Sequence, residues 1–152
     1  MTPGHPGPPM KSYSGMLPAK EAKLAKRKNK LRLGLFIAPF HAPNEDPTLA
    51  LERDLDITQY ADELGLAEVW FGEHHSGGYE IIMSPELMIA AAAQRTRRIM
   101  LGTGVITLPY HNPLMVANRI AQLDHLTRGR VIFGAGPGIL TADAHMLGLD
   151  AR

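Results

Sequence analysis

From Leu31 onward, short apolar runs alternate with longer stretches in which apolar residues recur at helical spacing. The runs are apolar almost throughout rather than at every second position, which is typical of parallel strands buried on both faces. They cover residues 31–40, 68–73, 99–108 and 130–136. Because a helical stretch follows each run, the sequence predicts an α/β fold of four consecutive βα units around a parallel sheet.

Signals for helix starts and ends support this prediction. Asp46, Ser84 and Asn112 each stand directly before a proline. A short polar side chain can accept hydrogen bonds from the free N–H groups of a first turn, and proline has no N–H to leave unpaired. Gly65 and Gly129 are placed to end the first and third helices in the left-handed conformation. We therefore expect a helix between each pair of runs.

The helical stretches also predict which side chains are buried. In the first stretch the apolar face is expected to consist of Ala50, Ile57, Ala61 and Leu64. In the third stretch it is expected to consist of Val116, Ile120 and Leu123. A fourth helix is expected to begin at Thr141.

The topology predicts where a ligand would bind. Connections between parallel strands are almost always right-handed, so the loops that follow the strands collect at one edge of the sheet. Ligands bind at that edge in both barrels and open α/β sheets. The segments that meet there are residues 38–41, 73–75, 102–108 and 134–138, and they hold glycine and polar residues.

Composition narrows the class of protein. With 45% hydrophobic residues the chain can bury one sizeable core. The formal charge of +1 divides into +6 over residues 1–30 and −5 over residues 31–152. The folded part is thus acidic, so nucleic-acid binding is not expected, and residues 1–30 are predicted to be a basic, disordered tail.

The sequence contains no cysteine and no apolar run of the roughly 18 residues that a membrane-spanning helix needs. The N-terminal residues also lack the order of a secretory signal. We therefore expect no disulfide and no membrane partner, with a cytoplasmic location as the default.

The stretch EVWFGEHHSGGYE places Glu73, His74 and His75 directly after the second predicted strand. Imidazole gains and loses protons near neutral pH, so this pair can serve as proton donor or acceptor. A hydrated or packed polar loop is the alternative interpretation. No metal site is predicted, because adjacent residues project in different directions and no i, i+4 pair of histidines occurs.

Glycines interrupt the third and fourth predicted strands, in IMLGTGV and in FGAGPG. As a dinucleotide fingerprint, FGAGPG is weak, because Ile139 stands where a third glycine belongs. A tight turn is one alternative. The other is that a backbone without side chains lets a planar ligand approach, which predicts a flat cofactor. No role is assigned to His41, His111, His125 and His145.

The segment EVWFGEHHS, followed by LGTGVITLPYHNPLMVANRIAQLDHLTRGRVIFGAGPG, resembles the bacterial luciferase-like flavin monooxygenase family, in particular its limonene 1,2-monooxygenase-like branch. The similarity extends from about Leu31 to Arg152. It implies a (β/α)8 TIM barrel that binds reduced FMN or FAD at its C-terminal rim. It also implies insertion of one oxygen atom from O2 into a small apolar substrate, such as a terpene or an aldehyde. NADH would supply electrons directly or through a flavin reductase.

The resemblance implies roles for the residues after the second strand. His74 matches the active-site histidine of the family, with His75 beside it, and both would manage protons near the flavin. Glu73 matches the acid of the same motif and would orient the site.

The resemblance also implies cofactor-binding residues. Thr103, Gly104 and Val105 match the segment on which the family packs the isoalloxazine ring, often through a cis peptide bond. Gly134 and Gly136 mark the neighbouring strand end. Gly136 and Pro137 stand where some luciferases have a cysteine and an arginine, so an arginine contact to the flavin phosphate is not expected here.

A complete barrel has eight strands, and four are counted here. Residues 31–152 are therefore expected to be the N-terminal half of a barrel, inactive by itself and dimeric in the full-length form. Two alternatives remain open. One is a deazaflavin-dependent oxidoreductase of the same fold, and the other is a non-catalytic half-barrel that binds flavin or a partner chain.

Overall fold

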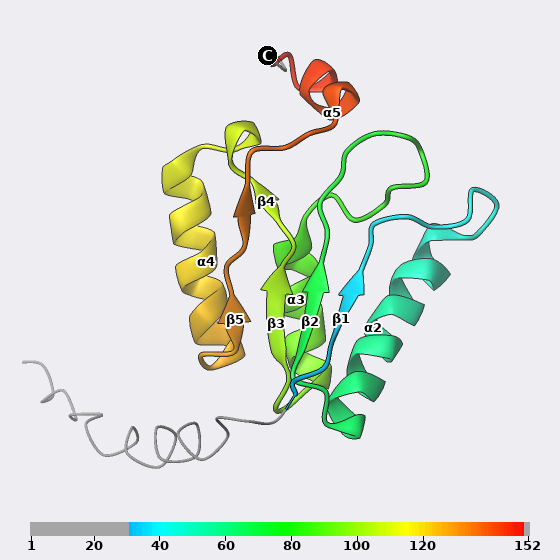
Figure 1. Ribbon diagram of the computed structural model, residues 1–152, viewed down its shortest axis with the longest axis vertical. Helices are drawn as coiled ribbons and strands as arrows, with labels where there is room; N and C mark the ends of the chain where they lie inside the picture. Colours follow the sequence, from blue (N-terminus) through cyan, green and yellow to red (C-terminus); the bar gives the residue numbers. More distant parts are fainter. Residues whose placement is uncertain (1–30, 151–152) are drawn as a thin grey trace, which may run out of the picture. The chain divides into compact units, whose positions relative to one another are not determined.

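The computed structural model describes residues 31–150, so the predicted tail lies outside the described residues. Four strands form a parallel sheet in the order β1-β2-β3-β5, and their arrowheads point to one edge (Figure 1). Their bounds are Gly34–Ile37 for β1, Glu68–Phe71 for β2, Met100–Thr103 for β3 and Val131–Ile132 for β5. The predicted parallel α/β fold is therefore confirmed.

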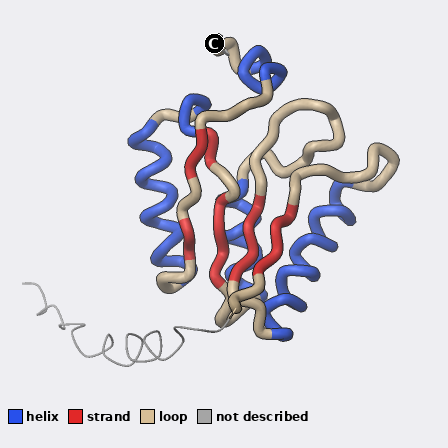
Figure 2. The backbone as a smooth tube through the Cα atoms, viewed as in Figure 1, coloured by secondary structure: helices blue, strands red, loops and turns tan. Residues whose placement is uncertain are grey.

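Three long helices lie alongside the sheet (Figure 2). Their buried side chains form one hydrophobic core with those of the strands. The helices are α2 (Pro47–Leu64), α3 (Pro85–Arg95) and α4 (Pro113–Thr127). From the strands, the fully buried Val69, Phe71 and Leu101 belong to this core. Burial of each such side chain contributes about 1.5–3 kcal/mol, so this layer fixes how the strand ends are placed.

Two of the three predicted helix starts carry the expected hydrogen bonds. The side chain of Asp46 accepts from the amides of Thr48 and Leu49, and Asn112 makes the equivalent pair of bonds in α4. Ser84 makes no side-chain bond to the first turn of α3. Its backbone (φ −143°, ψ 87°) differs from the extended conformation that lets the other two side chains reach the turn.

The helix ends agree with the sequence, with one shift. Gly65 is left-handed, with φ of 80°, and caps α2 as predicted. Arg128 takes the left-handed cap position of α4, one residue before the predicted Gly129, which is itself left-handed with φ of 76°.

The predicted buried face of α2 was partly wrong. Ile57 and Leu64 are exposed, at 41% and 62%. Instead, the buried positions of α2 include Asp54 and Asp62. These two acids are buried because both are hydrogen-bonded, Asp54 to the ring of His41 and Asp62 to the amides of residues 97–99.

The third and fourth predicted runs are each divided into two short strands. After β3 and β5 the chain continues as β4 (Ile106–Thr107) and β6 (Ala135–Gly136), which pair in a separate parallel sheet. The Gly104–Val105 peptide between β3 and β4 is cis. At the break between the two sheets, the Thr103 hydroxyl donates to the Gly134 carbonyl and accepts from the Gly134 amide, at 2.8 and 2.9 Å.

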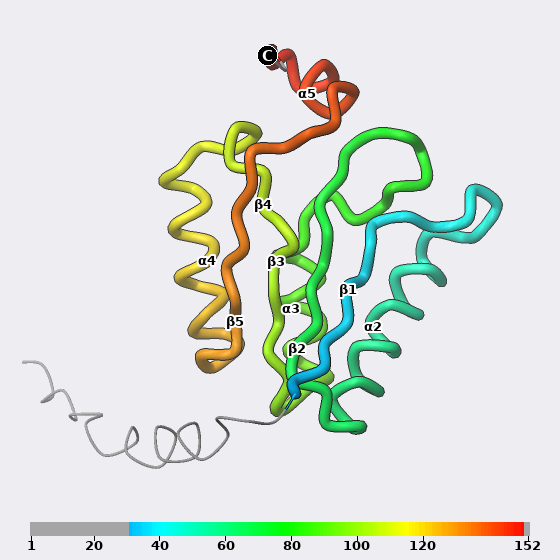
Figure 3. The backbone as a smooth tube through the Cα atoms, in the orientation of Figure 1, coloured from blue at the N-terminus to red at the C-terminus, as the bar shows by residue number. Residues whose placement is uncertain are grey.

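The chain then continues at the same edge of the sheet. The 3-10 helix η1 (Leu108–Tyr110) follows β4. The short helix α5 (Thr141–Met146), which was predicted to begin at Thr141, follows β6, and Figure 3 shows it beyond the ends of the strands. Within residues 31–150, no helix combines the length and the apolar character needed to cross a membrane.

The sheet face opposite the core carries aromatic side chains. Phe36 is 60% exposed and Trp70 is half-buried, and both alternate with core residues along their strands. A Cβ atom on Gly102 would lie 2.4 Å from the Trp70 ring. Glycine is therefore required at this position because the indole lies directly over it.

Candidate active site at the carboxyl edge of the sheet

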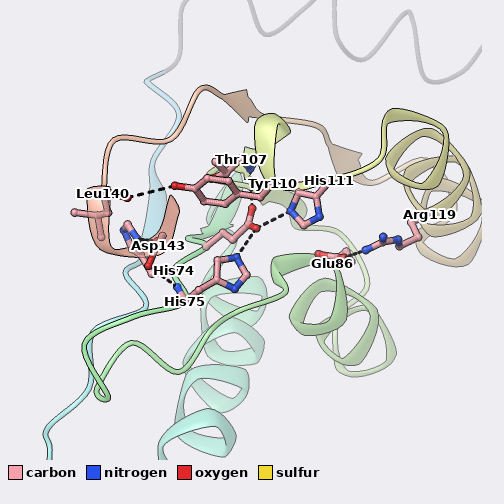
Figure 4. A network of polar contacts seen from close by, with 10 residues as sticks. His74, His75, Glu86, Thr107, Tyr110, His111, Arg119, Leu140 and Asp143 are labelled. Atoms are coloured by element: carbon pink, nitrogen blue, oxygen red, sulfur yellow. Dashed lines mark hydrogen bonds and ion pairs between the residues drawn. The ribbon is translucent and has the colours of Figure 1, made fainter. Parts of the chain in front are cut away.

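Three segments that are distant in the sequence meet beyond the carboxyl ends of the strands. The loop after β2 supplies Glu73, His74 and His75, the segment after β4 supplies His111, and α5 supplies Asp143 (Figure 4). The predicted meeting of strand ends at one edge thus brings the three candidate catalytic residues into one polar network.

Glu73 is the centre of one half of this network. Its side chain is 1% exposed. One carboxylate oxygen accepts from Nε2 of His75 at 2.9 Å and from Nε2 of His111 at 2.7 Å, and the other accepts from the Thr107 amide at 2.7 Å. Three hydrogen bonds thus hold the carboxylate in place, and the orienting role that the resemblance implies for Glu73 remains a prediction.

His111, to which the sequence assigns no role, is the second imidazole bound to Glu73. In the sequence it stands just beyond the third apolar run, and this position predicts that it lies at the edge of the sheet where a ligand is expected to bind. The sequence does not reveal its partner, because Glu73 is 38 residues away and is reached only through the topology of the sheet.

Asp143, which the sequence motifs do not identify, is the centre of the other half. Its residue is 1% exposed. One oxygen faces Nδ1 of His74 at 3.1 Å and the other accepts from the amide of His75 at 3.2 Å. Burial raises the pKa of this carboxyl, but hydrogen bonds from Ser76, His74 and the His75 amide outweigh that effect, so its pKa lies below the ordinary value.

His74 is the most exposed histidine of the network. Its side chain is 25% exposed, against 20% for His75 and 17% for His111. The Phe40 ring lies 5.9 Å from the His74 ring, centroid to centroid. Within residues 31–150, the side chain of His74 is hydrogen-bonded through Nδ1, and Nε2 has no hydrogen-bond partner.

Tyr110 lies against His75 edge-on, with ring centroids 5.9 Å apart. Its hydroxyl is 3.5 Å from the Leu140 carbonyl oxygen. Burial raises the pKa of Tyr110, and the nearby charges of Asp143 and Glu73 raise it further, so Tyr110 is a neutral phenol at neutral pH.

Glu80 adds a second buried carboxylate beside His74. It is 7% exposed, and one nitrogen of His74 and one oxygen each of Glu80 and Asp143 lie within 4.8 Å of one another. As a possible metal site, the sequence offers Glu73, His74 and His75. In the structure, the possible ligand atoms that lie close together belong instead to His74, Glu80 and Asp143. The sequence did not identify this group, because Asp143 arrives from α5.

The predicted cofactor-binding residues surround the break between β3 and β4. Thr103 is fully buried, and its hydroxyl is engaged by Gly134. Cβ atoms on Gly104 and Gly136 would lie 3.0 Å from the Phe36 ring and 2.7 Å from a Val105 methyl group. Side chains of this protein thus lie close against the two glycines. Contact of these glycines with a flat cofactor remains a prediction.

The Gly134 position is equally crowded, because a Cβ atom there would lie 2.2 Å from the Thr103 carbonyl oxygen. Its role in cofactor binding likewise remains a prediction. Val105 is half-buried, so part of its side chain is open to a ligand.

A flavin ring fits the chemistry of this edge better than a flavin phosphate does. The exposed Phe36 and the half-buried Trp70 offer apolar surface on the open face of the sheet, and Nε2 of His74 offers a proton acceptor beyond its carboxyl end. The segments 38–41, 73–75, 102–108 and 134–138 contain no lysine or arginine. They therefore supply no positive side chain for a phosphate.

The fold and the candidate site define a class of protein, an α/β protein of consecutive βα units whose candidate site lies at the carboxyl ends of parallel strands. Residues 31–152 match the family model described as luciferase-like monooxygenase, and the chain belongs to that family. The α/β fold with its parallel sheet corresponds to part of the TIM barrel of these enzymes.

Three relatives illustrate the match. Limonene 1,2-monooxygenase of Rhodococcus erythropolis is 59% identical over 117 residues, which are 77% of this chain and 30% of that protein. 4-hydroxyprotoasukamycin monooxygenase of Streptomyces nodosus subsp. asukaensis is 54% identical over 121 residues, which are 80% of this chain and 33% of that protein. The chain thus spans about a third of the length of these relatives.

The third relative is a solved structure. The oxygenating constituent of 3,6-diketocamphane monooxygenase of Pseudomonas putida, a type II Baeyer–Villiger monooxygenase in complex with FMN, superposes with a TM-score of 0.75 and 29% identity. The superposition covers 78% of this chain and 33% of that chain.

Proposed function

We propose that the protein carrying this chain is a flavin-dependent monooxygenase that inserts one oxygen atom from O2 into a small apolar substrate. The observation that carries the proposal is the placement of a half-buried histidine with a free Nε2 at the ligand edge of a luciferase-like fold. The limonene 1,2-monooxygenase relative supports a terpene-like substrate and the limonene branch of the family.

The cofactor that we propose is reduced FMN, because the superposed diketocamphane enzyme is in complex with FMN. FAD is the alternative flavin. When bound, the flavin supplies the chemistry that activates oxygen, and the chain supplies orientation, exclusion of water and proton handling. Because that relative is an oxygenating constituent, we further propose a separate flavin reductase that takes electrons from NADH.

Flavin contact, proton handling and positioning of the histidines are assigned to residues of this chain. Phe36 and Trp70 would cover the apolar part of the ring, and His74 would hold or accept a proton through Nε2. Glu73 and Asp143 keep the histidines in place through the contacts described above. We also propose a homodimer and a cytoplasmic location, where NADH is available.

Labelled oxygen tests this function. Purified full-length protein is incubated with FMN, a flavin reductase, NADH and limonene under ¹⁸O2, and the product is analysed by mass spectrometry. We expect one labelled oxygen atom per product and no product without O2. Replacement of His74 with alanine should lower the rate by about 10²- to 10⁴-fold, the usual range for loss of a proton-transfer group.

The outcome also separates the alternatives. Turnover that persists without oxygen, with a deazaflavin as hydride carrier, would favour the deazaflavin-dependent oxidoreductase. Flavin binding without turnover, unchanged in the His74→Ala variant, would favour a non-catalytic binding domain.

A further inference from the structure

The two adjacent histidines are held through different ring nitrogens. His74 is bound through Nδ1, which faces Asp143, and His75 is bound through Nε2, which faces Glu73. An ionised carboxylate can only accept, so the nitrogen that faces it is the one that carries the proton. In their neutral forms the two rings are therefore opposite tautomers.

The surroundings of Asp143 keep its carboxylate a hydrogen-bond acceptor. It is 1% exposed and receives the His75 amide on one oxygen while the other faces His74. The hydrogen bonds that lower its pKa keep it ionised at neutral pH. One carboxylate on α5 thus fixes both the ring of His74 and the backbone that follows it.

Glu73 holds the second histidine in a different way. Its two oxygens are shared among His75, His111 and the Thr107 amide, and its side chain is almost fully buried. The Nε2 atom of His75 therefore points into the protein. Of the two rings, only His74 has its Nε2 free of such a partner in the described part of the chain.

We propose that Asp143 is a positioning residue that holds His74 as the Nδ1–H tautomer and so presents its Nε2 lone pair to the ligand, whereas His75 and Glu73 form the supporting scaffold. The geometry of the chain carries the tautomer assignment, and only the identity of the ligand rests on the function proposed above.

Nuclear magnetic resonance of histidine-labelled protein tests the proposal without any flavin. In ¹⁵N-histidine full-length protein, long-range proton–nitrogen correlations show which ring nitrogen carries the proton, and single replacements of His74 and His75 assign the signals. We expect the Nδ1–H form for His74 and the Nε2–H form for His75 at a pH where both rings are neutral. An Nε2–H form for His74 in the parent protein overturns the proposal.

Two variants distinguish the effect of Asp143 on the His74 tautomer from the effect of the neighbouring carboxylate of Glu80. Asp143→Asn can present either an oxygen or an NH2 group to His74, so the Nδ1–H form should lose its dominance. Glu80→Gln removes the other carboxylate charge near His74 but leaves the Asp143 contact, so the tautomer should stay as in the parent. The same tautomer in the Asp143→Asn variant, or its loss in the Glu80→Gln variant alone, contradicts the assignment. A failure of flavin to bind would weigh against the proposed function and leave this result unaffected.

Discussion

Replacing Glu73 with glutamine tests whether this carboxylate is the structural centre of the site. Glutamine keeps the size of the side chain but turns one acceptor oxygen into an NH2 donor. The Thr107 amide can only donate, so the new NH2 group should turn toward the imidazoles, where a ring can change tautomer and accept. We therefore expect the Thr107 contact to survive and the contacts to His75 and His111 to weaken.

The magnitude follows from the contacts. A hydrogen bond to a charged group contributes about 1.5–3 kcal/mol, and Glu73 accepts three in a buried position. Loss of the charge with one contact kept should lower the free energy of unfolding by about 2–3 kcal/mol. Glu73→Ala leaves three donors without an acceptor and should cost about 3–5 kcal/mol, as for a broken buried pair.

Urea unfolding of the full-length protein measures these differences. Glu63→Gln is the matched control, because Glu63 is exposed on α2 and, among residues 31–150, has only Gln59 as a hydrogen-bond partner. It should leave the unfolding curve close to that of the parent. If Glu73→Gln and Glu63→Gln unfold at the same urea concentration, the carboxylate does not hold the site together and the reasoning fails.

Two further predictions concern the support of the site. Asp62 accepts from three successive amides, 97 to 99, and although burial raises its pKa, these bonds bring it below the ordinary value. Its stabilisation is therefore complete above the ordinary aspartate pKa and is lost as the pH falls through the lowered one. Asp62→Asn should cost about 2 kcal/mol of unfolding free energy near neutral pH and less in acid, and a pH-independent difference would refute this. Gly102→Ala should cost about 1–3 kcal/mol and shift the fluorescence of Trp70, because the new methyl group meets the indole, and an unchanged spectrum would count against that packing.

Features set by neighbouring residues could be predicted from the sequence. The apolar runs gave the parallel strands, and the caps at Asp46 and Asn112 formed because a cap contacts only its own first turn. Ile57 and Leu64 were misplaced because the buried face of α2 is decided by contacts with distant segments. Asp54 and Asp62 could enter that face once His41 and the amides of residues 97–99 supplied their hydrogen bonds.

The candidate site could likewise be predicted from the sequence only in part. Glu73, His74 and His75 are adjacent in the sequence, so their shared position at the ligand edge could be predicted. His111 and Asp143 join them from 38 and 69 residues away. The sequence predicted that the loops after the strands converge, but not which side chains meet, because that depends on the register of the sheet and on the path into α5.

Flavin is proposed to bind at the carboxyl edge of the sheet, against His74. Titration of ¹⁵N-histidine full-length protein with FMN tests it most directly, with His125 on the exposed side of α4 as the internal reference. We predict that the ring signals of His74 shift in proportion to bound FMN while those of His125 stay in place. Saturation with FMN that leaves the His74 signals unmoved would contradict the claim.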